Sequence, residues 1–457
     1  MAERAGQPRP GEIAGGAATG GIVGRIYGNL GKLIGGKAAA GLISLAYMAI
    51  AARALGPSDY GVLILVHGFA MTVGGIIEFP GWHAVVRFGA QAIEAGDQPR
   101  LARLLRFTGL VEGMGGVLAV ATAALLAPLI GPRLGWSPAA IAFAVPYSLA
   151  VLASIRSTPA GYLQLAGRFD LLGAHNVVAP IVRLAGAIVA YALGAGLHGY
   201  LVAWLVAALA EWAAMWLLGI LVARRQLGGV ALIGSPRGAV AENIGIWRFM
   251  IAANADITFG ELSARIAPLA VGWVLGPAAA GLYAIAQRAT VIIAQPAQIL
   301  GQAAYAELAR MVASGGNGAQ VRLALARCVG VAFLAAVPVL LLITLFGREL
   351  AVLIGGKTFA AAGAVMLWLA VARAILLLGP PTSAALVALG RPGLSVAANL
   401  ATGLGLLPLL PLLMRHYGLA GAGFHALLTA VVAAVMLAWF VWHASTEIAA
   451  DRERILA

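Results

Sequence analysis

Charged residues are scarce in this chain. Only 10% of its 457 residues are Asp, Glu, Lys or Arg, while 61% are hydrophobic. Soluble domains carry roughly 25% charged residues, so this composition excludes a water-soluble fold. Cysteine is also scarce, since Cys328 is the single one, and this excludes an intrachain disulfide.

Motifs for catalysis and cofactor binding are missing from the sequence. It contains no GxxxxGK[ST] loop, so ATP is not expected as the energy source. Its 7 histidines and its cysteine are scattered, without the spacing of metal ligands. We therefore expect a protein that is not an enzyme and that holds no metal and no cofactor.

Long apolar segments fill the sequence instead. A helix needs about 20 apolar residues to cross a bilayer, and a lipid-exposed backbone must satisfy its own hydrogen bonds. The segments lack the period-two alternation of barrel strands. We predict an all-α polytopic membrane protein with about twelve transmembrane helices, at residues 33–54, 60–83, 106–130, 138–160, 172–194, 198–222, 247–274, 279–303, 327–350, 361–388, 393–414 and 419–443.

The chain repeats itself at about half its length. LGPSDYG at Leu55–Gly61 returns as LGPAAAG at Leu275–Gly281, an offset of 220 residues (275 − 55). Gly167 of Ala-Gly-Arg returns as Gly390 of Leu-Gly-Arg, an offset of 223 (390 − 167). Repeats of this size are typical of transporters whose binding site lies between the two repeats.

The repeat divides the chain into three parts. We predict two pseudo-symmetric six-helix bundles, an N-terminal one at residues 31–230 and a C-terminal one at residues 231–457. Residues 1–30 are rich in Gly and Ala and have no apolar core, so we expect a flexible cytosolic tail there and not a signal peptide.

Basic residues gather on one side of this topology. The net charge is +13, but with the N-terminus inside, most Lys and Arg fall on the cytosolic ends and loops. The opposite side carries few of them, namely Arg53, Arg133, Arg348, Lys357 and Arg415. This asymmetry is the positive-inside pattern. It predicts a multi-pass protein of the bacterial inner membrane with both termini in the cytoplasm, and no nucleic-acid partner.

Several segments together resemble one family. They are the two LGP motifs with LGPAAAGLYAIAQRA at Leu275–Ala289, VVRFGAQ at Val85–Gln91, the Ala-Gly-Arg around Gly167, and FGRELAVLIGGKTFAAAG at Phe346–Gly363. Over residues 33–443 the chain is similar to polysaccharide exporters of the O-antigen flippase type, which belong to the multidrug/oligosaccharidyl-lipid/polysaccharide superfamily.

The resemblance implies two six-helix bundles that form a V around a central cavity and open it alternately to the two sides. It implies a flippase that moves an undecaprenyl-diphosphate oligosaccharide across the inner membrane, for lipopolysaccharide O-antigen or another surface polysaccharide. The partners that it implies are this lipid-linked glycan, the lipid bilayer and polysaccharide-assembly proteins.

Charged side chains inside the spans are the candidates for function, since each costs about 2.5–3.5 kcal/mol at the bilayer centre. In the seventh span, Glu261 and Arg265 lie one turn apart and share a helix face with Asn254 and Thr258. They form either a packing ion pair or a part of the cavity wall. Asp256 points elsewhere, and Asp256 or Glu261 could bind a coupling proton or sodium ion.

Arginines without an obvious partner indicate an anion site. Arg183 and Arg373 have no carboxylate nearby in the sequence, and a diphosphate would offer bidentate acceptors. The alternative is a carboxylate on another helix, such as Glu112 or Glu211. Lys37, near the start of the first span, either joins the cationic site or reaches to the interface.

A polar stripe follows the eighth span. Gln287 shares one helix face with other polar residues, and Arg288 lies beside this stripe. The other members of the stripe are Tyr283, Thr290, Gln298 and Gln302. Their amides and hydroxyls either contact sugar hydroxyls or make hydrogen bonds between helices.

Two other functions stay open. A multidrug/cation antiporter of the same superfamily would favour an acidic cavity, whereas the unpaired groups within these spans lean towards Arg. A membrane glycan polymerase or ligase would need a sizeable basic periplasmic loop, which the predicted topology does not contain.

Overall fold

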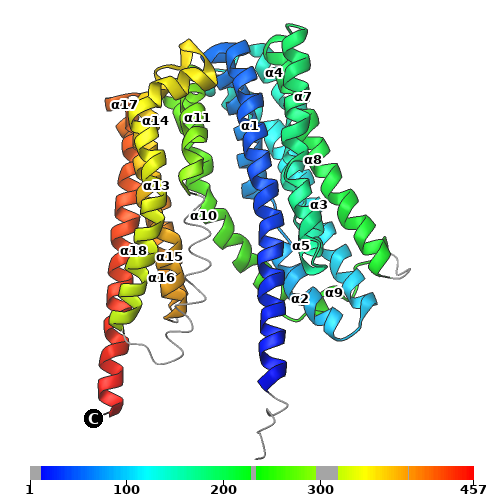
Figure 1. Cartoon of the computed structure of the whole chain (residues 1–457). Coiled ribbons are helices and arrows are strands. Elements are labelled where there is room, and N and C mark those ends of the chain that lie inside the picture. The colour runs from blue at the N-terminus through cyan, green and yellow to red at the C-terminus, as the bar shows by residue number, and fades with distance from the viewer. Residues whose placement is uncertain (1–11, 228–232, 295–317, 390, 457) are drawn as a thin grey trace, which may run out of the picture.

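The structure is a computed structural model that describes residues 12–227, 233–294, 318–389 and 391–456. Every regular element in these residues is a helix (Figure 1). The predicted all-α class is therefore confirmed for the part of the chain that the structure describes.

The helices of the N-terminal half follow the predicted spans, with several of them broken into two pieces. They are α1 (Glu12–Ile77), α2 (Trp82–Glu94), α3 (Gln98–Ile130), η1 (Gly131–Leu134), α4 (Pro138–Tyr147), η2 (Ser148–Ser154), α5 (Ser157–Leu165), α6 (Phe169–His175), α7 (Val178–Ala192) and α8 (Gly196–Gln226), where η marks a 3₁₀ segment.

The short α9 (Ala239–Glu242) connects this half to the second one. The helices of the C-terminal half are α10 (Ile246–Leu275), α11 (Pro277–Thr290), η3 (Val291–Ala294), α13 (Gly318–Gly355), η4 (Lys357–Phe359), α14 (Ala362–Leu376), α15 (Gly379–Ala388), α16 (Pro392–Gly403), α17 (Leu409–Tyr417) and α18 (Leu419–Leu456).

Helix starts follow ordinary signals in the sequence. The side chain of Asp97 accepts the backbone N–H of Arg100 at 2.8 Å where α3 begins. Ser137 does the same for Ala140 at 3.2 Å where α4 begins. Such caps satisfy backbone donors that the first turn of a helix leaves without a partner.

Helical segments that can cross a membrane are numerous. Eight of them in the described residues are long and apolar enough. The first, Gly35–Ile77, has 43 residues, more than twice the ~20 that one crossing needs. It contains a break at Gly56, so it covers two predicted spans. The multi-pass membrane fold is confirmed, and the count of about twelve stays a prediction.

The N-terminal end differs from the expectation of a flexible tail. Helix α1 begins at Glu12, so residues 12–30 extend this helix. After Pro10 the stretch has no proline, the residue that disfavours a helix most, although its glycines also lower helix propensity. The predicted tail is therefore helical from Glu12 onward.

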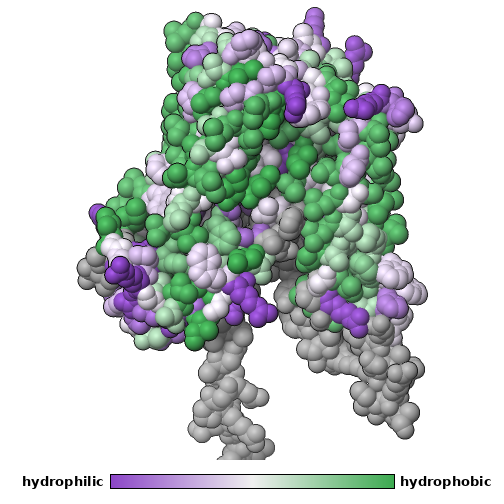
Figure 2. Space-filling view, turned by 180° about the vertical axis from the view of Figure 1, so that it is seen from behind, coloured by the Kyte–Doolittle hydropathy of each residue, from purple (hydrophilic) through white to green (hydrophobic). Residues whose placement is uncertain are grey.

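The two halves form two bundles that meet at one end and part at the other (Figure 1). In Figure 1, α3, α7 and α8 stand on one side of α1, and α13, α14 and α18 stand on the other, with α10 and α11 between. Both ends of the described chain lie at the parted end. Figure 2 shows apolar side chains over much of the surface of both bundles, as expected for contact with lipid.

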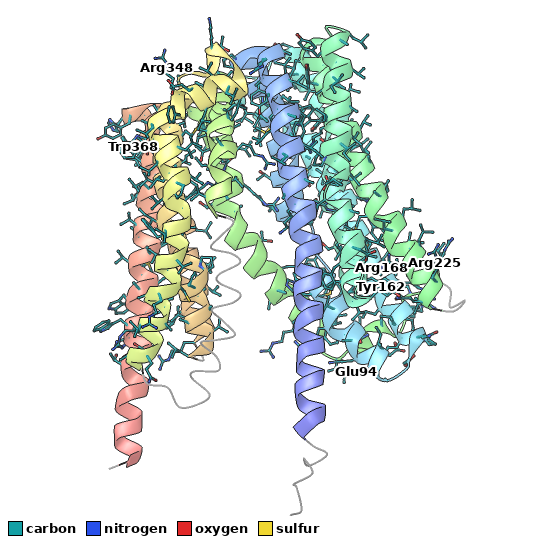
Figure 3. The ribbon with its side chains drawn as sticks, viewed as in Figure 1. Glu94, Tyr162, Arg168, Arg225, Arg348 and Trp368 are labelled. Carbon is teal, nitrogen blue, oxygen red and sulfur yellow. The ribbon has the colours of Figure 1, made fainter. Side chains whose placement is uncertain are left out.

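The labelled residues in Figure 3 follow the predicted charge asymmetry. Arg168 and Arg225 lie towards the parted end, as does Glu94, while Arg348 lies at the closed end. The two ends of the described chain and these basic residues therefore share one side of the molecule.

The two LGP motifs have the same backbone geometry. Gly56 has φ 70° and ψ 177°, and Gly276 has φ 85° and ψ 174°. This region is open to glycine alone. Pro57 and Pro277 follow, each at the start of a new helical run, where a missing N–H costs nothing. The sequence repeat is thus a repeated helix break.

The two motifs touch each other at the closed end. A Cβ on Gly61 would collide with the carbonyl oxygen of Pro277, and a Cβ on Gly281 would collide with that of Pro57. The contact between α1 and α11 is thus made by equivalent residues of the two repeats, which are 220 positions apart in the sequence. Around it, the rings of Tyr60 and Phe359 stand edge to face, with centroids 5.8 Å apart.

We predict that Gly281→Leu disrupts this closed end. The added side chain has no space beside the Pro57 carbonyl, and overpacking typically costs about 1–3 kcal/mol. The purified variant should melt at a lower temperature than the natural protein. Gly41→Leu is the control, because a Cβ there meets no atom within 4 Å. Equal melting temperatures of the two variants would contradict the contact.

Candidate functional site

Arg183 lies inside the N-terminal bundle, among side chains of α1 and α8. Its Nη2 donates to Nε2 of His67 at 3.1 Å, and its Nη1 donates to the hydroxyl of Tyr47 at 3.4 Å. Its guanidinium carbon is 5.8 Å from the ring centroids of Tyr47 and Trp204. These contacts hold the cation against aromatic faces, which attract it through their quadrupoles.

The imidazole of His67 extends this network. Its Nδ1 lies 2.9 Å from the hydroxyl of Tyr147. Because Arg183 can only donate, Nε2 of His67 must accept, and the proton of the neutral ring is therefore on Nδ1. His67 thus orients Arg183 without neutralising its charge.

The carboxylates proposed as partners of Arg183 are engaged elsewhere. Glu211 forms an ion pair with Arg156. Glu112, which is 1% exposed, accepts the backbone N–H of Thr158 at 2.8 Å and that of Ser157. Among the described side chains, no ion pair involves Arg183, and its Nε is buried without a hydrogen-bond partner.

Arg373 and Arg288 belong to the C-terminal half. Nε of Arg373 on α14 donates to the hydroxyl of Thr290 on α11 at 3.1 Å. Thr290 therefore makes an interhelical contact, one of the two roles predicted for the stripe. Arg288 lies close enough to α1 for its charge to act on Tyr47. Tyr47 is thus approached by Arg183 from one half and by Arg288 from the other.

Gln287 and Lys37 contribute less to this arrangement. Gln287 is half-buried on α11, and its backbone carbonyl accepts the Thr290 hydroxyl at 3.0 Å. Lys37 is exposed on α1. Gln298 and Gln302 lie outside the described residues.

Arg265 joins the two halves. From α10 its Nη1 donates to the carbonyl of Met71 on α1 at 2.9 Å. Its guanidinium occupies the space that a side chain at Gly75 would fill. The side chains of Glu261 and Asp256 lie outside the described residues, so the Glu261–Arg265 pair and the ion-binding role of these acids stay predictions.

Glu78, directly after α1, is an acid that our reading of the sequence did not select as a candidate. Its Oε2 is buried without a hydrogen-bond partner among the described residues. The charges of Arg265, Arg156 and Glu112 act on it. The aromatic residues around Arg183 gave no signal either, because Tyr and Trp in a span read as ordinary packing.

We predict that Arg265→Ala loosens the contact between the halves. The variant loses a charged hydrogen bond to Met71 and leaves a space beside Gly75, so its melting temperature should fall, with a loss of about 1–3 kcal/mol. Arg248→Ala is the matched control, since Arg248 is exposed on the same helix. A melting temperature as high as that of the control would refute the bridging role.

Comparison with known proteins agrees with this architecture. The profile of a family described as polysaccharide biosynthesis protein matches residues 50–363. Inner membrane protein YghQ of Escherichia coli (strain K12) is 27% identical over 270 residues, which cover 59% of this chain and 76% of that protein.

Solved structures share the fold at low sequence identity. An inward-facing multidrug resistance MATE family transporter of the MOP superfamily superposes with a TM-score of 0.66 at 16% identity, covering 89% of this chain and 94% of that one. Lipid II flippase MurJ, in an inward closed conformation, gives 0.65 at 11% identity, with 88% and 85% covered. The resemblance drawn from the LGP motifs is confirmed: the chain belongs to the polysaccharide biosynthesis protein family and shares the fold of solved MOP-superfamily transporters.

Proposed function

We propose that this protein flips a lipid-linked oligosaccharide, carried on undecaprenyl diphosphate, from the cytosolic to the periplasmic leaflet of the bacterial inner membrane. In this proposal it acts as a transporter and not as an enzyme. The family description favours a role in polysaccharide synthesis, and a lipid II flippase shares the fold.

The observation that carries the proposal is the state of Arg183. A guanidinium within the bundle costs several kcal/mol unless something compensates it. Here the described partners are a neutral imidazole, a hydroxyl and two aromatic rings. A diphosphate supplies the anion that these partners lack, with oxygen atoms spaced for the guanidinium fork.

Arg288 and Arg373 extend this cationic surface into the C-terminal half. Arg373 uses Nε for Thr290, and in this proposal its terminal N–H groups, for which the described residues show no acceptor, bind the substrate. The half-buried Gln287 adds an amide of the kind that binds sugars. The diphosphate would then sit between the bundles, near the crevice where such transporters bind their substrates.

The parted end is the cytosolic one in this proposal. Arg168 and Arg225 lie towards it, and both ends of the described chain are there (Figure 3). Basic residues collect on the cytosolic side of inner-membrane proteins. The arrangement described is then open to the cytosol, the state that would receive the lipid-linked glycan from its synthesis.

Arg183→Ala and Arg373→Ala should abolish export of the surface glycan while leaving membrane levels unchanged. Each removes hydrogen bonds to a charged group worth about 1.5–3 kcal/mol, a loss of roughly 10- to 100-fold in affinity. The Lys variants should keep part of the activity, because the charge remains but the fork is lost. The measurement is complementation of glycan export in a strain that lacks the protein.

Arg225→Ala is the control for this series, because Arg225 is exposed at the end of α8. It should export normally. Normal export from both the Arg183→Ala and the Arg373→Ala strains would remove the anion site. If export falls only in proportion to the amount of the variant protein in the membrane, the Ala substitution has impaired folding. The corresponding Lys variant then tests whether the arginine is needed for export.

The orientation has a direct test. In a Cys328→Ala background, Arg348→Cys should react with a membrane-impermeant maleimide in cells whose outer membrane alone is permeabilised. Arg225→Cys should react only after the inner membrane is opened. The reverse pattern would place the termini in the periplasm.

A further inference from the structure

A long apolar groove runs along the C-terminal bundle between α13, α15 and α18. Its volume is about 690 Å³, within the range of small-molecule sites. Val329, Phe333 and Leu334 of α13 form much of one wall. Thr382 of α15 also lines it, but its hydroxyl donates to the carbonyl of Leu378 at 2.6 Å. The wall is therefore suited to hydrocarbon.

The N-terminal bundle shows what fills the same place in the other half. Gly196 and Gly418 stand at the starts of α8 and α18 with φ 56° and φ 57°, an offset of 222 (418 − 196). At this offset Trp216 corresponds to Ala438. At this pair of equivalent positions, the N-terminal bundle carries an indole and the C-terminal bundle carries only a methyl group.

The neighbouring helices are related in the same way. Gly135 and Gly356 both end a helix with positive φ, an offset of 221 (356 − 135). At this offset Gly109 of α3 corresponds to Gly330 of α13. The indole of Trp216 lies 3.4 Å from the Cβ position of Gly109, whereas a Cβ on Gly330 would meet no atom within 4 Å.

Trp216 therefore seals its bundle. Its Nε1 also donates to the carbonyl of Ile155 at 2.8 Å, which ties α8 to the end of η2. In the second half Ala438, Gly330 and Leu378 all line the groove. The groove of the C-terminal bundle therefore lies at the place that the side chain of Trp216 fills in the N-terminal bundle.

A cation stands at one end of the groove. Nη1 of Arg322 donates to the hydroxyl of Ser445 at 2.8 Å, and its guanidinium carbon lies 4.7 Å from the ring centroid of Trp442. This end lies towards the parted end of the molecule, where α18 finishes (Figure 1). The corresponding residue of the N-terminal half is Leu101 (322 − 221), so the cation belongs to the open groove alone.

The groove opens towards the lipid. Leu334 is 72% exposed and Trp442 is 60% exposed, and in a membrane-spanning bundle such side chains face acyl chains. From Arg322 to Val337 the wall follows 15 helical steps of α13 (337 − 322), or ~22 Å of helix. One leaflet contributes about half of the ~30 Å hydrocarbon core, or ~15 Å. The groove is therefore long enough for a chain that enters at the interface and crosses the whole of its own leaflet.

We propose that this groove binds one acyl chain of an anionic glycerophospholipid from the leaflet at the parted end, with the lipid phosphate at Arg322. The chain fills the space beside Gly330 and Ala438 that the indole of Trp216 fills in the other bundle. The phosphate accepts from the guanidinium N–H groups that Ser445 does not use. The bound lipid is a structural partner of the C-terminal bundle, independent of the transported molecule.

The experiment uses the full chain in nanodiscs that contain phosphatidylglycerol with a photoreactive diazirine in the middle of one acyl chain. After irradiation, mass spectrometry should find labelled peptides from α13 and α18 around Gly330 and Ala438. Ala438→Trp, which copies Trp216, should lower this labelling at least tenfold. Ala438→Phe is a smaller filling variant and should lower it in the same direction.

Leu345→Trp is the matched control, because Leu345 is 68% exposed on α13 and lies outside the groove. It should label like the natural protein. Arg322→Ala should remove the preference for a phosphatidylglycerol probe over a phosphatidylcholine probe, and Arg322→Lys should retain most of it.

Three results would overturn the proposal. Labelling that is unchanged in Ala438→Trp places the lipid elsewhere. The absence of labelling around Gly330 and Ala438 in the natural protein means that no such lipid occupies the groove. Displacement of the probe by low concentrations of undecaprenyl phosphate, but not by unlabelled phosphatidylglycerol, assigns the groove to the carrier lipid.

Discussion

The backbone contact between the two Gly-Pro motifs holds the halves together at one end, and the rest of the structure depends on it. In lipid no hydrophobic force draws helices together, so their association relies on close van der Waals packing between small residues. Gly61 and Gly281 provide this by admitting the carbonyls of Pro277 and Pro57. This contact lies at the closed end, where the bundles meet, and they part at the other end (Figure 1).

The same joint brings arginines of both halves towards α1. Arg265 donates to the carbonyl of Met71, Arg183 donates to the hydroxyl of Tyr47, and the charge of Arg288 acts on the same tyrosine. A cation costs about 2.5–3.5 kcal/mol at the bilayer centre, and in the part of the chain that the structure describes Arg183 is compensated by rings and neutral groups. Such contacts lower the cost of burial but leave the charge in place. This remaining charge is the ground for the anion site that we propose.

The sequence predicted the features that depend on neighbouring residues of the chain, namely helix breaks and long apolar helices. A glycine-only backbone break followed by proline is readable at Gly56 and Gly276, and apolar length is readable in every span. Arg183 could be selected because a buried cation is costly. Its neighbours could not, since Tyr47 and Trp204 come from α1 and α8, and helical periodicity relates only residues of one helix. The start of α1 at Glu12 was not predicted, because the low apolar content of residues 1–30 was interpreted as a sign of a flexible tail.

The two halves share the backbone breaks of the repeat but differ in the side chains at equivalent positions. At the offset of 220 that relates the LGP motifs, His67 corresponds to Gln287 (287 − 67). The helix face that orients Arg183 in one half therefore carries an amide in the other, beside Arg288. Likewise Trp216 closes one bundle where Ala438 leaves the other open. The substrate that we propose, with a charged diphosphate, a polar glycan and a lipid tail, is not symmetric, whereas the repeated helix breaks give the two halves similar backbones. Under this proposal, differences at equivalent positions would let each half contact a different part of the molecule, while the glycines and prolines of the LGP motifs stay the same in both.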